Sequence, residues 1–303
     1  MKVISIILTT YNAEKTIQRT LDSIFNQEGL NVDFSIELLI VDDCSTDNTK
    51  QIIENNNIEY FTTSENSGGP NKGRNIGLAK AIGDFICIMD HDDEWLPGKI
   101  SSQLAASELA PIISCGYTEV NDNSGKTKDY VNKSNTADGY NYYSENATFL
   151  DLLTRYKKGQ KTYIGGLMIH KSLKGIYFEE EYAMVDFDWG LKLFHDRTSV
   201  EICKPSYIRH ISGSNLSLNE NYRINDYKYS LKTIENYKEK YPKQIGKFYK
   251  RINGTMGRYY YHLEDMKKAR KYFFKSYFNI KILAYIMTSF YGYKYIKKRF
   301  RVF

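Results

Sequence analysis

Acidic side chains crowd together directly after an apolar run at residues 85–89. Residues 90–94 read Asp-His-Asp-Asp-Glu, which places four carboxylates within five positions. Such charges repel one another unless a cation lies among them. Carboxylate oxygens favour Mg²⁺ or Mn²⁺, and Mg²⁺ is usually held by one or two carboxylates together with substrate phosphates. The cluster therefore predicts a metal site, although considered alone it also fits a solvated turn.

Two more polar clusters follow apolar, β-branched runs in the same way. Thr9 and Tyr11 come after a run at residues 3–8, and Asp42 and Asp43 come after a run at residues 36–41. Both runs predict buried strands. In a parallel sheet, ligands bind beyond the carboxyl ends of the strands. We therefore expect the three clusters to share one rim of a sheet.

The elements that must position these clusters alternate between strand and helix. Further strands are predicted at residues 58–61 and 84–89. Helices are predicted at residues 13–25 and 49–54. A Gly-Gly-Pro turn at residues 68–70 opens a third helix, which runs to residue 81 and has Gly83 as its C-cap. This alternation is typical of βαβ crossovers and of a mostly parallel sheet flanked by helices. The fold class is accordingly α/β and Rossmann-like.

Positive charge suited to phosphate is found at the start of the third predicted helix. Lys72 and Arg74 lie in GGPNKGRN, where helix amides point outward, although both could also be surface charges. The stretch lacks the spacing of a Walker loop, and no GxGxxG follows the first strand. Tyr11 could lie against a nucleotide base, and Asp43 could accept a hydrogen bond from the ring N–H of that base. Together these residues predict a site for a metal-bound nucleoside diphosphate.

The series TTYN, VDDCSTDNT and NSGGPNKGRNIGLAKAIGDFICIMDHDDEW resembles the nucleotide-binding half of a family 2 glycosyltransferase with the GT-A fold. The resemblance covers about the first hundred residues. It implies an inverting enzyme that uses a nucleotide sugar, with a UDP-sugar favoured, and Mn²⁺ or Mg²⁺. The implied nucleotide-binding residues are Thr9, Tyr11, Asp42, Asp43, Lys72, Arg74, Asp90, His91 and Asp92. Asp90-His91-Asp92 matches the DXD motif, and Asp92, Asp93 and His210 are the implied metal ligands. Which of the three aspartates binds the ion stays open.

The acceptor half resembles the family less completely. Residues 164–173 resemble the strand beside the acceptor pocket, and residues 178–194 resemble the segment that usually carries a Glu-Asp pair. Here the pair reads Val185-Asp186, so only the second acid is present. Inversion needs a base opposite the leaving group, and Asp186 is the predicted catalytic base. Asp188 is its rival. Asp186 could instead cap a helix, and His210 could be an ordinary hydrogen-bonded histidine at a strand end.

Charge is distributed unevenly along the chain. Residues 1–221 hold 21 Lys and Arg against 31 Asp and Glu, a net charge of −10. Residues 222–303 hold 21 against 5, a net charge of +16, together with 15 of the 27 tyrosines. We predict a glycosyltransferase domain at 1–221, in which 1–100 bind the nucleotide sugar and 101–221 face the acceptor. A basic helical extension follows at 222–303, with helices at 224–242, 244–262 and 264–278.

The extension predicts an anionic partner. Its last segment, residues 279–303, joins an apolar run to a Tyr-, Lys- and Arg-rich end, which suits the surface of an anionic membrane. No nucleic-acid-binding motif accompanies the charge, so nucleic acid is not predicted. A solvated helical cap or a contact between copies in a homo-oligomer is the alternative. Neither a signal peptide nor a transmembrane run is recognised, and the four cysteines are scattered. We expect a cytoplasmic protein at the inner face of the cell membrane.

The predicted function is transfer of a sugar to a hydroxyl of a glycan or lipid-linked glycan, in the synthesis of a surface polysaccharide. Two alternatives stay open. A sugar-phosphate nucleotidyltransferase would also bind a nucleotide and Mg²⁺ on an α/β sheet, but LTTYNAEKT lacks its Gly-rich loop. A non-catalytic scaffold that keeps the fold is the other, because the first acid of the Glu-Asp pair is absent.

Overall fold

A computed structural model describes residues 1–154, 159–212, 220–292 and 294. The chain divides into two compact units. The first comprises Met1–Leu152 and Tyr156–Asp226, and the second comprises Leu153–Arg155 and Tyr227–Phe303. The boundary falls within helix α7 (Glu220–Glu235), slightly beyond the boundary at 221/222 predicted from charge.

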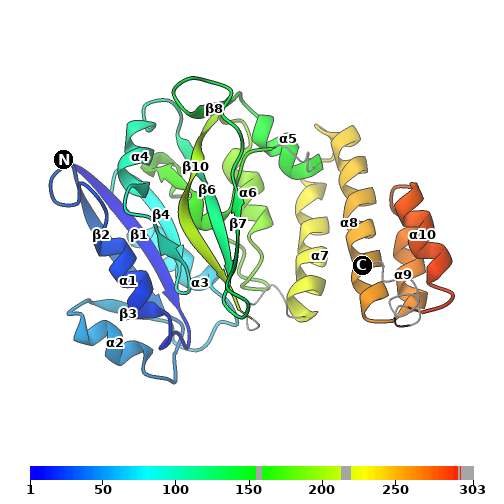
Figure 1. Cartoon of the computed structure of the whole chain (residues 1–303), viewed down its shortest axis with the longest axis horizontal. Helices are drawn as coiled ribbons and strands as arrows, with labels where there is room; N and C mark the ends of the chain where they lie inside the picture. Colours follow the sequence, from blue (N-terminus) through cyan, green and yellow to red (C-terminus); the bar gives the residue numbers. More distant parts are fainter. Residues whose placement is uncertain (155–158, 213–219, 293, 295–303) are drawn as a thin grey trace. The chain divides into compact units, whose positions relative to one another are not determined.

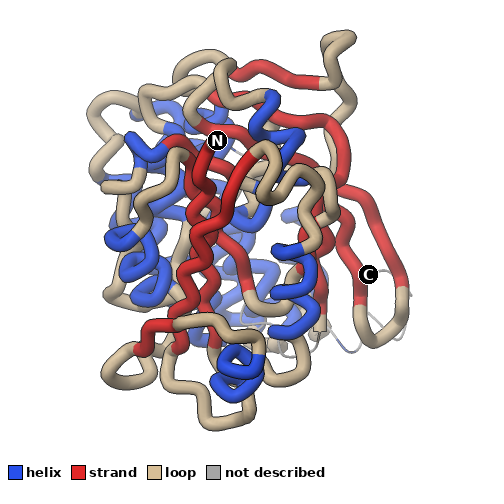
Figure 2. Tube along the Cα trace, turned by 90° about the vertical axis from the view of Figure 1, so that its left-hand side faces the viewer, coloured by secondary structure: helices blue, strands red, loops and turns tan. Residues whose placement is uncertain are grey.

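The first unit is built on a mixed sheet that runs through its middle (Figure 2). Among the described residues the strand order is β3-β2-β1-β4-β9-β6-β10-β5, while β7 pairs with β6 and β8 pairs with β10. The strands are β1 (Lys2–Thr10), β2 (Phe34–Asp42), β3 (Tyr60–Thr62), β4 (Phe85–Asp90), β5 (Glu94–Trp95), β6 (Ile112–Asn121), β7 (Lys126–Tyr130), β8 (Tyr140–Tyr143), β9 (Met168–His170) and β10 (Ser199–Ile211).

The longest pairings in this sheet are parallel. Strand β1 lies between β2 and β4, and its end is in register with both, since Thr10 is opposite Asp42 and Thr9 is opposite Asp90. Strand β9 is antiparallel to both of its neighbours, β4 and β6. The polar ends of three strands therefore meet at one edge, and the predicted α/β fold class is confirmed.

Six α-helices lie wholly or mostly in the described part of the first unit, in which α7 also begins (Figure 1). They are α1 (Ile17–Phe25), α2 (Thr49–Asn55), α3 (Asn71–Lys80), α4 (Lys99–Ala105), α5 (Ala147–Thr154) and α6 (Phe187–Phe194). Two predicted boundaries were wrong. Helix α1 begins at Ile17 rather than at residue 13, after a turn in which Thr16 N donates to Ala13 O. Helix α3 ends at Lys80, so Gly83 is not its C-cap.

Gly83 instead allows the chain to approach β1 closely. A Cβ at this position would lie 2.7 Å from Ser5 N and 2.8 Å from Val3 O. The Gly83 N–H donates to Ser5 Oγ at 2.9 Å. Close contact with the backbone of β1 therefore explains this glycine, whereas helix termination does not.

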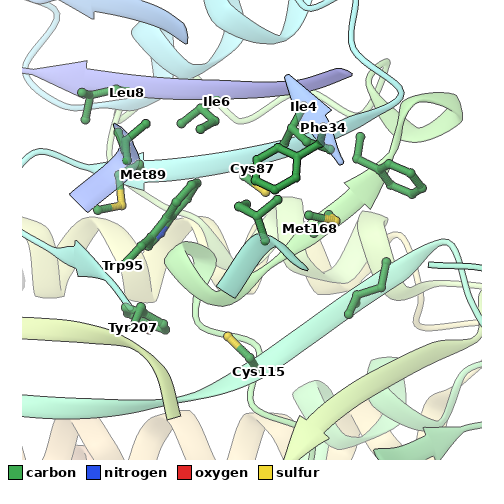
Figure 3. Close-up of a cluster of buried hydrophobic side chains, with 14 of the residues drawn as sticks. Ile4, Ile6, Leu8, Phe34, Cys87, Met89, Trp95, Cys115, Met168 and Tyr207 are labelled. Carbon is green, nitrogen blue, oxygen red and sulfur yellow. The ribbon is translucent and has the colours of Figure 1, made fainter. Parts of the chain in front are cut away.

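The two faces of β1 pack against different layers. Ile4, Ile6 and Leu8 are fully buried and belong to a cluster with Cys87 and Met89 of β4, drawn in Figure 3. The alternate residues face α3 on the other side, where a Cβ at Gly77 would lie only 2.4 Å from Ile7 Cγ2. Alternation of side chains along a strand explains why both faces of this strand are covered.

The second unit is helical. It contains the end of α7 together with α8 (Pro242–His262), α9 (Met266–Phe273) and α10 (Ile280–Thr288). Helix α8 begins with proline at its first position, where the missing N–H costs nothing. Its core is aromatic, and the ring of Tyr285 lies 5.0 Å from that of Tyr261 and 5.3 Å from that of Phe273. Among the described residues no helix is long and apolar enough to cross a bilayer.

Candidate active site

A cavity of about 580 Å³ opens at the carboxyl edge of the parallel strands. Its walls come from the ends of β1 and β4, the start of α3, the loop before α6, and β10. The lining residues are Thr9, Thr10, Tyr11, Asn12, Val41, Asp43, Asn66, Gly68, Gly69, Pro70, Gly73, Arg74, Asp90, His91, Asp92, Tyr163, Ile164, Met184, Asp186, Arg209 and Tyr222. Three clusters remote in sequence thus share one rim, as expected from the strand ends.

Asp43 lines the cavity next to the end of β1, where its N–H donates to Thr10 O at 2.8 Å. Its two carboxylate oxygens accept hydrogen bonds from Ser67 N at 3.0 and 3.1 Å, and Thr63 Oγ1 donates to one of them at 2.8 Å. These donors hold the carboxylate in place while a lone pair stays available to a ring N–H of a ligand. Tyr11, the residue after Thr10, also lines the cavity and is 44% exposed, so its ring is accessible to a base.

Arg74 and Asp90 form an ion pair in the cavity wall. Arg74 Nη2 lies 2.8 Å from Asp90 Oδ1, and Arg74 Nη1 donates to Asn71 Oδ1 at 3.2 Å. The guanidinium also lies over the ring of Phe178, 5.2 Å from its centre. These contacts bury Arg74 and fix its charge at the N-terminal turn of α3. An anion bound there would be stabilised by the guanidinium and by the amides at the start of the helix.

The turn at residues 91–93 is held by side chains of α1. Thr20 Oγ1 donates to His91 O at 3.0 Å and to Asp93 O at 2.8 Å, and Arg19 Nη2 donates to Asp92 O at 2.7 Å. Burial raises the pKa of Asp92 and raises that of Asp93 well above the usual range. The charge of Asp90 adds to both shifts. The turn therefore concentrates negative charge that a bound cation would offset.

Four of the predicted site residues do not line the cavity. The Asp42 side chain is fully buried and accepts from Ser45 N at 2.9 Å and Thr10 Oγ1 at 3.0 Å, so it braces the end of β2. Lys72 is half-buried on α3, outside the lining. Asp93 Oδ1 accepts from His210 N at 3.0 Å behind the cavity wall.

The ring of His210 is also directed elsewhere. Its Nδ1 lies 2.7 Å from Asp122 Oδ1, and its Nε2 lies 2.7 Å from Glu94 Oε1. Both ring nitrogens are thus within hydrogen-bond distance of carboxylates outside the cavity lining. The rest of the loop considered with it in the sequence, residues 213–217, lies outside the described residues.

Asp186 lies on the wall formed by the loop before α6. It occupies the N-cap position of that helix but makes no capping hydrogen bond through its side chain. Its rival Asp188 is buried and lies 2.5 Å from Lys192 Nζ. Of the two, only Asp186 lines the cavity, so a substrate hydroxyl in the cavity could reach it. The segment at residues 164–173 is strand only at Met168–His170, flanked by single turns of 3₁₀ helix.

Among the lining residues that were not predicted from the sequence are Arg209, Tyr163 and Tyr222. Arg209 lies with its guanidinium 4.6 Å from the ring centre of Tyr163, and its Nη1 lies 3.4 Å from Glu119 Oε2. Tyr222 comes from the first turn of α7, and burial followed by the charge of Asp186 raises its pKa. Arg209 was within reach of sequence reasoning, because side chains alternate along a strand and its neighbour His210 had been singled out.

Residues 5–172 match the sequence profile described as glycosyl transferase family 2. The chain belongs to this family. Over 97 residues it is 42% identical to the poly(ribitol-phosphate) beta-N-acetylglucosaminyltransferase TarS of Staphylococcus aureus, a match covering 31% of this chain and 17% of that protein. Over 126 residues it is 36% identical to the UDP-Glc:alpha-D-GlcNAc-diphosphoundecaprenol beta-1,3-glucosyltransferase WfgD of Escherichia coli, covering 40% of this chain and 48% of that protein.

Solved structures share the fold of this family member over most of the chain. The structure of S. aureus TarS 1–349 in complex with UDP superposes with a TM-score of 0.60 at 21% identity, covering 96% of this chain and 89% of that one. The complex with UDP-GlcNAc gives 0.61 at 20% identity, covering 95% and 84%. The matched stretches span less than half of the curated relatives named above.

Members of this family typically use a divalent cation. Among the described residues no group of three or more His, Cys, Asp or Glu side chains is arranged to hold one. Mg²⁺ usually needs only one or two protein carboxylates when substrate phosphates supply other ligands. Asp90 and Asp92 offer such oxygens at the cavity, and behind them the buried Asp93 Oδ2 has no hydrogen-bond partner. This donor set fits a hard divalent cation.

Proposed function

We propose that this chain is an inverting glycosyltransferase that moves a sugar from a UDP-sugar to an acceptor hydroxyl. The observation that carries the proposal is the composition of one cavity. It combines Asp43, the Arg74–Asp90 pair with Asp92 beside it, and Asp186 on another wall. A uracil N–H requires a hydrogen-bond acceptor, and a diphosphate requires compensating positive charge. A reacting hydroxyl requires a base.

In the proposed reaction Asp186 takes the proton from the acceptor hydroxyl. The freed oxygen forms a bond to the anomeric carbon while the bond from that carbon to the diphosphate oxygen breaks, which inverts the configuration. Arg74 and the amides at the start of α3 stabilise the negative charge on the departing UDP. A Mn²⁺ or Mg²⁺ ion held by Asp92, with Asp90 or Asp93 as further donors, would supply Lewis-acid neutralisation of the same diphosphate.

Two aspartate variants test this assignment. Asp186→Asn should abolish sugar transfer but leave metal-dependent UDP binding intact, because only the base is lost. Asp92→Asn should lose both, because the diphosphate end of the site is lost. UDP binding is measured by calorimetry with Mn²⁺ present, and turnover by the UDP released from a panel of UDP-sugars. Full activity of Asp186→Asn would overturn the base assignment, and a wild-type chain without turnover would favour a non-catalytic scaffold.

We further propose that the acceptor is a glycan or lipid-linked glycan used in a surface polysaccharide. The names of the relatives support this, since one acts on poly(ribitol-phosphate) and another on a diphosphoundecaprenol-linked sugar. Undecaprenol-linked acceptors reside in a membrane, so an enzyme acting on them works at its surface. An acceptor screen with lipid-linked and polymeric substrates would decide between these classes.

The second unit carries features that support attachment to an anionic membrane at the cytoplasmic face. Several large apolar side chains between residues 274 and 291 are exposed, and the most exposed, Ile280, is 88% accessible. The exposed side chains are Phe274, Tyr277, Phe278, Ile280, Leu283, Met287, Phe290 and Tyr291. Exposed apolar patches of this kind mark interaction sites.

Charge favours a lipid surface as the occupant of this apolar face. Residues 266–291 contain six Lys and Arg and no Asp or Glu. A second copy of the same face would bring like charges together, whereas anionic headgroups attract each Lys or Arg by about 1 kcal/mol. Residue 293 and residues 295–303 of the predicted membrane-binding segment lie outside the described residues.

Vesicle sedimentation tests the membrane proposal on the full chain. Ile280→Ser combined with Phe290→Ser should weaken binding to phosphatidylglycerol-containing vesicles, because two exposed apolar contacts are removed. The matched control is Ile82→Ser, which removes a side chain exposed to a similar extent in the first unit. Equal partition of all three proteins would contradict the proposal. Loss of a dimer in the double variant would instead identify the face as a contact between copies.

A further inference from the structure

The loop that leads to Asp186 is organised around a buried carboxylate. Glu179 is 5% exposed, and its Oε2 accepts a hydrogen bond from Tyr182 N at 2.7 Å. Its Oε1 accepts from Val185 N at 2.8 Å and from Met184 N at 3.2 Å. Amide donors on both oxygens offset the cost of burying the charge, and the loop backbone folds around the carboxylate as a result.

Asn71 fastens this loop to the start of α3. The residue is fully buried, and its Nδ2 donates to Glu179 O at 3.0 Å and to Val185 O at 2.9 Å. Its backbone N–H donates to Ala183 O at 3.0 Å. Because Asn71 Oδ1 also accepts from Arg74, one side chain connects the loop of Asp186 to the cation in the cavity wall.

The loop also lies unusually close to the residues before α3. A Cβ on Gly69 would lie 2.3 Å from Ala183 O, so only glycine permits this approach. Ala183 itself has φ of +59°, a left-handed conformation that costs an L-residue roughly 1–2 kcal/mol. Such strain persists only where surrounding contacts over-determine the backbone. The hydrogen bonds of Glu179 and Asn71 hold the backbone at Ala183 in this conformation.

We propose that Glu179 is a positioning residue, which holds the backbone of residues 182–185 so that Asp186 is directed into the cavity. This inference rests on the proposed function, because it assigns Glu179 a role through the base. Glu179 does not line the cavity, so it acts through the loop. Its loss should therefore lower the rate of transfer and leave the affinity for UDP unchanged.

Glu179→Gln is the sharpest perturbation because it keeps the shape of the side chain. One carboxylate oxygen becomes an NH₂ group, which then faces an amide N–H of the loop and cannot accept its hydrogen bond. We expect kcat for UDP release to fall about tenfold to a hundredfold, the scale of a displaced catalytic group. The matched control is Glu180→Gln. Glu180 is exposed and accepts from Asn75 Nδ2 rather than from the loop backbone.

Three readouts on the full chain decide the proposal. In Glu179→Gln the amides of residues 182–185 should exchange hydrogen faster, kcat should fall, and Kd for UDP should change by less than about twofold. Glu180→Gln should match the wild type in every readout.

The outcomes separate this proposal from the proposed function. If Asp186→Asn is inactive but Glu179→Gln turns over like the wild type, the positioning role is refuted while the enzyme assignment stands. A fall in the affinity for UDP as large as the fall in kcat refutes it as well. If the wild type releases no UDP from any UDP-sugar, the proposed function fails, and hydrogen exchange reports only on the loop. Should Glu179→Gln fail to fold, Gly69→Ala perturbs the same loop from the α3 side.

Discussion

Two adjacent aspartates at the end of β2 provide a matched pair of perturbations. Asp42 and Asp43 differ by one position, and both were predicted from the sequence to bind the nucleotide. In the structure Asp42 is enclosed by the protein, whereas Asp43 lines the cavity. We expect Asp42→Asn to lower stability without changing UDP affinity, and Asp43→Asn to weaken UDP binding.

The size of the Asp42 effect follows from its hydrogen bonds. Its carboxylate accepts from Ser45 N at 2.9 Å, Ser45 Oγ at 2.5 Å and Thr10 Oγ1 at 3.0 Å. The amide of asparagine keeps one acceptor oxygen, but its NH₂ group replaces the other oxygen and cannot accept that oxygen's hydrogen bond. Hydrogen bonds to charged groups are worth about 1.5–3 kcal/mol each. We expect a loss of about 2–4 kcal/mol, which lowers the midpoint of thermal unfolding by roughly 5–12 °C in a unit of this size.

The effect of Asp43 is expected in binding. Losing one charge-assisted hydrogen bond to the uracil ring should weaken UDP about tenfold to a hundredfold. Thermal unfolding without ligand and calorimetric titration with UDP separate the two effects. Asp43→Asn also loses bonds from Ser67, so the discriminating quantity is UDP affinity rather than stability. If Asp42→Asn weakens UDP as strongly as Asp43→Asn and leaves the unfolding midpoint unchanged, the reasoning fails.

Further substitutions test the ion pair of Arg74, the packing of α3 on β1 and the role of Arg209. Arg74→Met should lower the free energy of unfolding by about 2–4 kcal/mol in urea denaturation, because it leaves a partly buried carboxylate without its cation; a loss below about 0.5 kcal/mol would contradict this. Gly77→Ala should cost about 1–3 kcal/mol, since the new methyl meets Ile7, whereas Gly246→Ala, on a helix with open space, should stabilise by about 0.5–1 kcal/mol. The same sign for both would refute the packing argument. Arg209→Gln should weaken UDP binding about tenfold if this cation faces the diphosphate, and unchanged affinity would place it on the acceptor side.

The nucleotide half of the fold could be predicted because its signals are local. Buried strands appear as β-branched runs, and the polar residues that follow them must meet at one edge of a parallel sheet. The register of β1 with β2 and β4 brings Thr9 and Asp90 together at this edge. Helix ends were less predictable. Gly83 is of the residue type expected at a helix C-cap, but its contact with β1 depends on tertiary packing.

Residue pairs one position apart set the limit of sequence reasoning within the site. From residue type alone, Asp42 and Asp43 are equally good candidates for the site, and so are Arg209 and His210. The structure separates each pair, because neighbouring side chains at a strand end point to opposite sides. Arg209 faces the cavity while His210 lies between Glu94 and Asp122. Deciding between them requires knowing which side of the strand is covered, and that is a property of the whole sheet.

The acceptor half depends on contacts that no local pattern reveals. Asn71 and Glu179 are 108 positions apart, yet their hydrogen bonds hold the loop that ends at Asp186. Val185, found where a Glu was expected, made a non-catalytic scaffold a reasonable alternative. Its side chain is fully buried, and its amide donates to Glu179. An acid placed earlier in the loop thus restrains the backbone beside Asp186, so the valine at 185 does not by itself leave the proposed base without support.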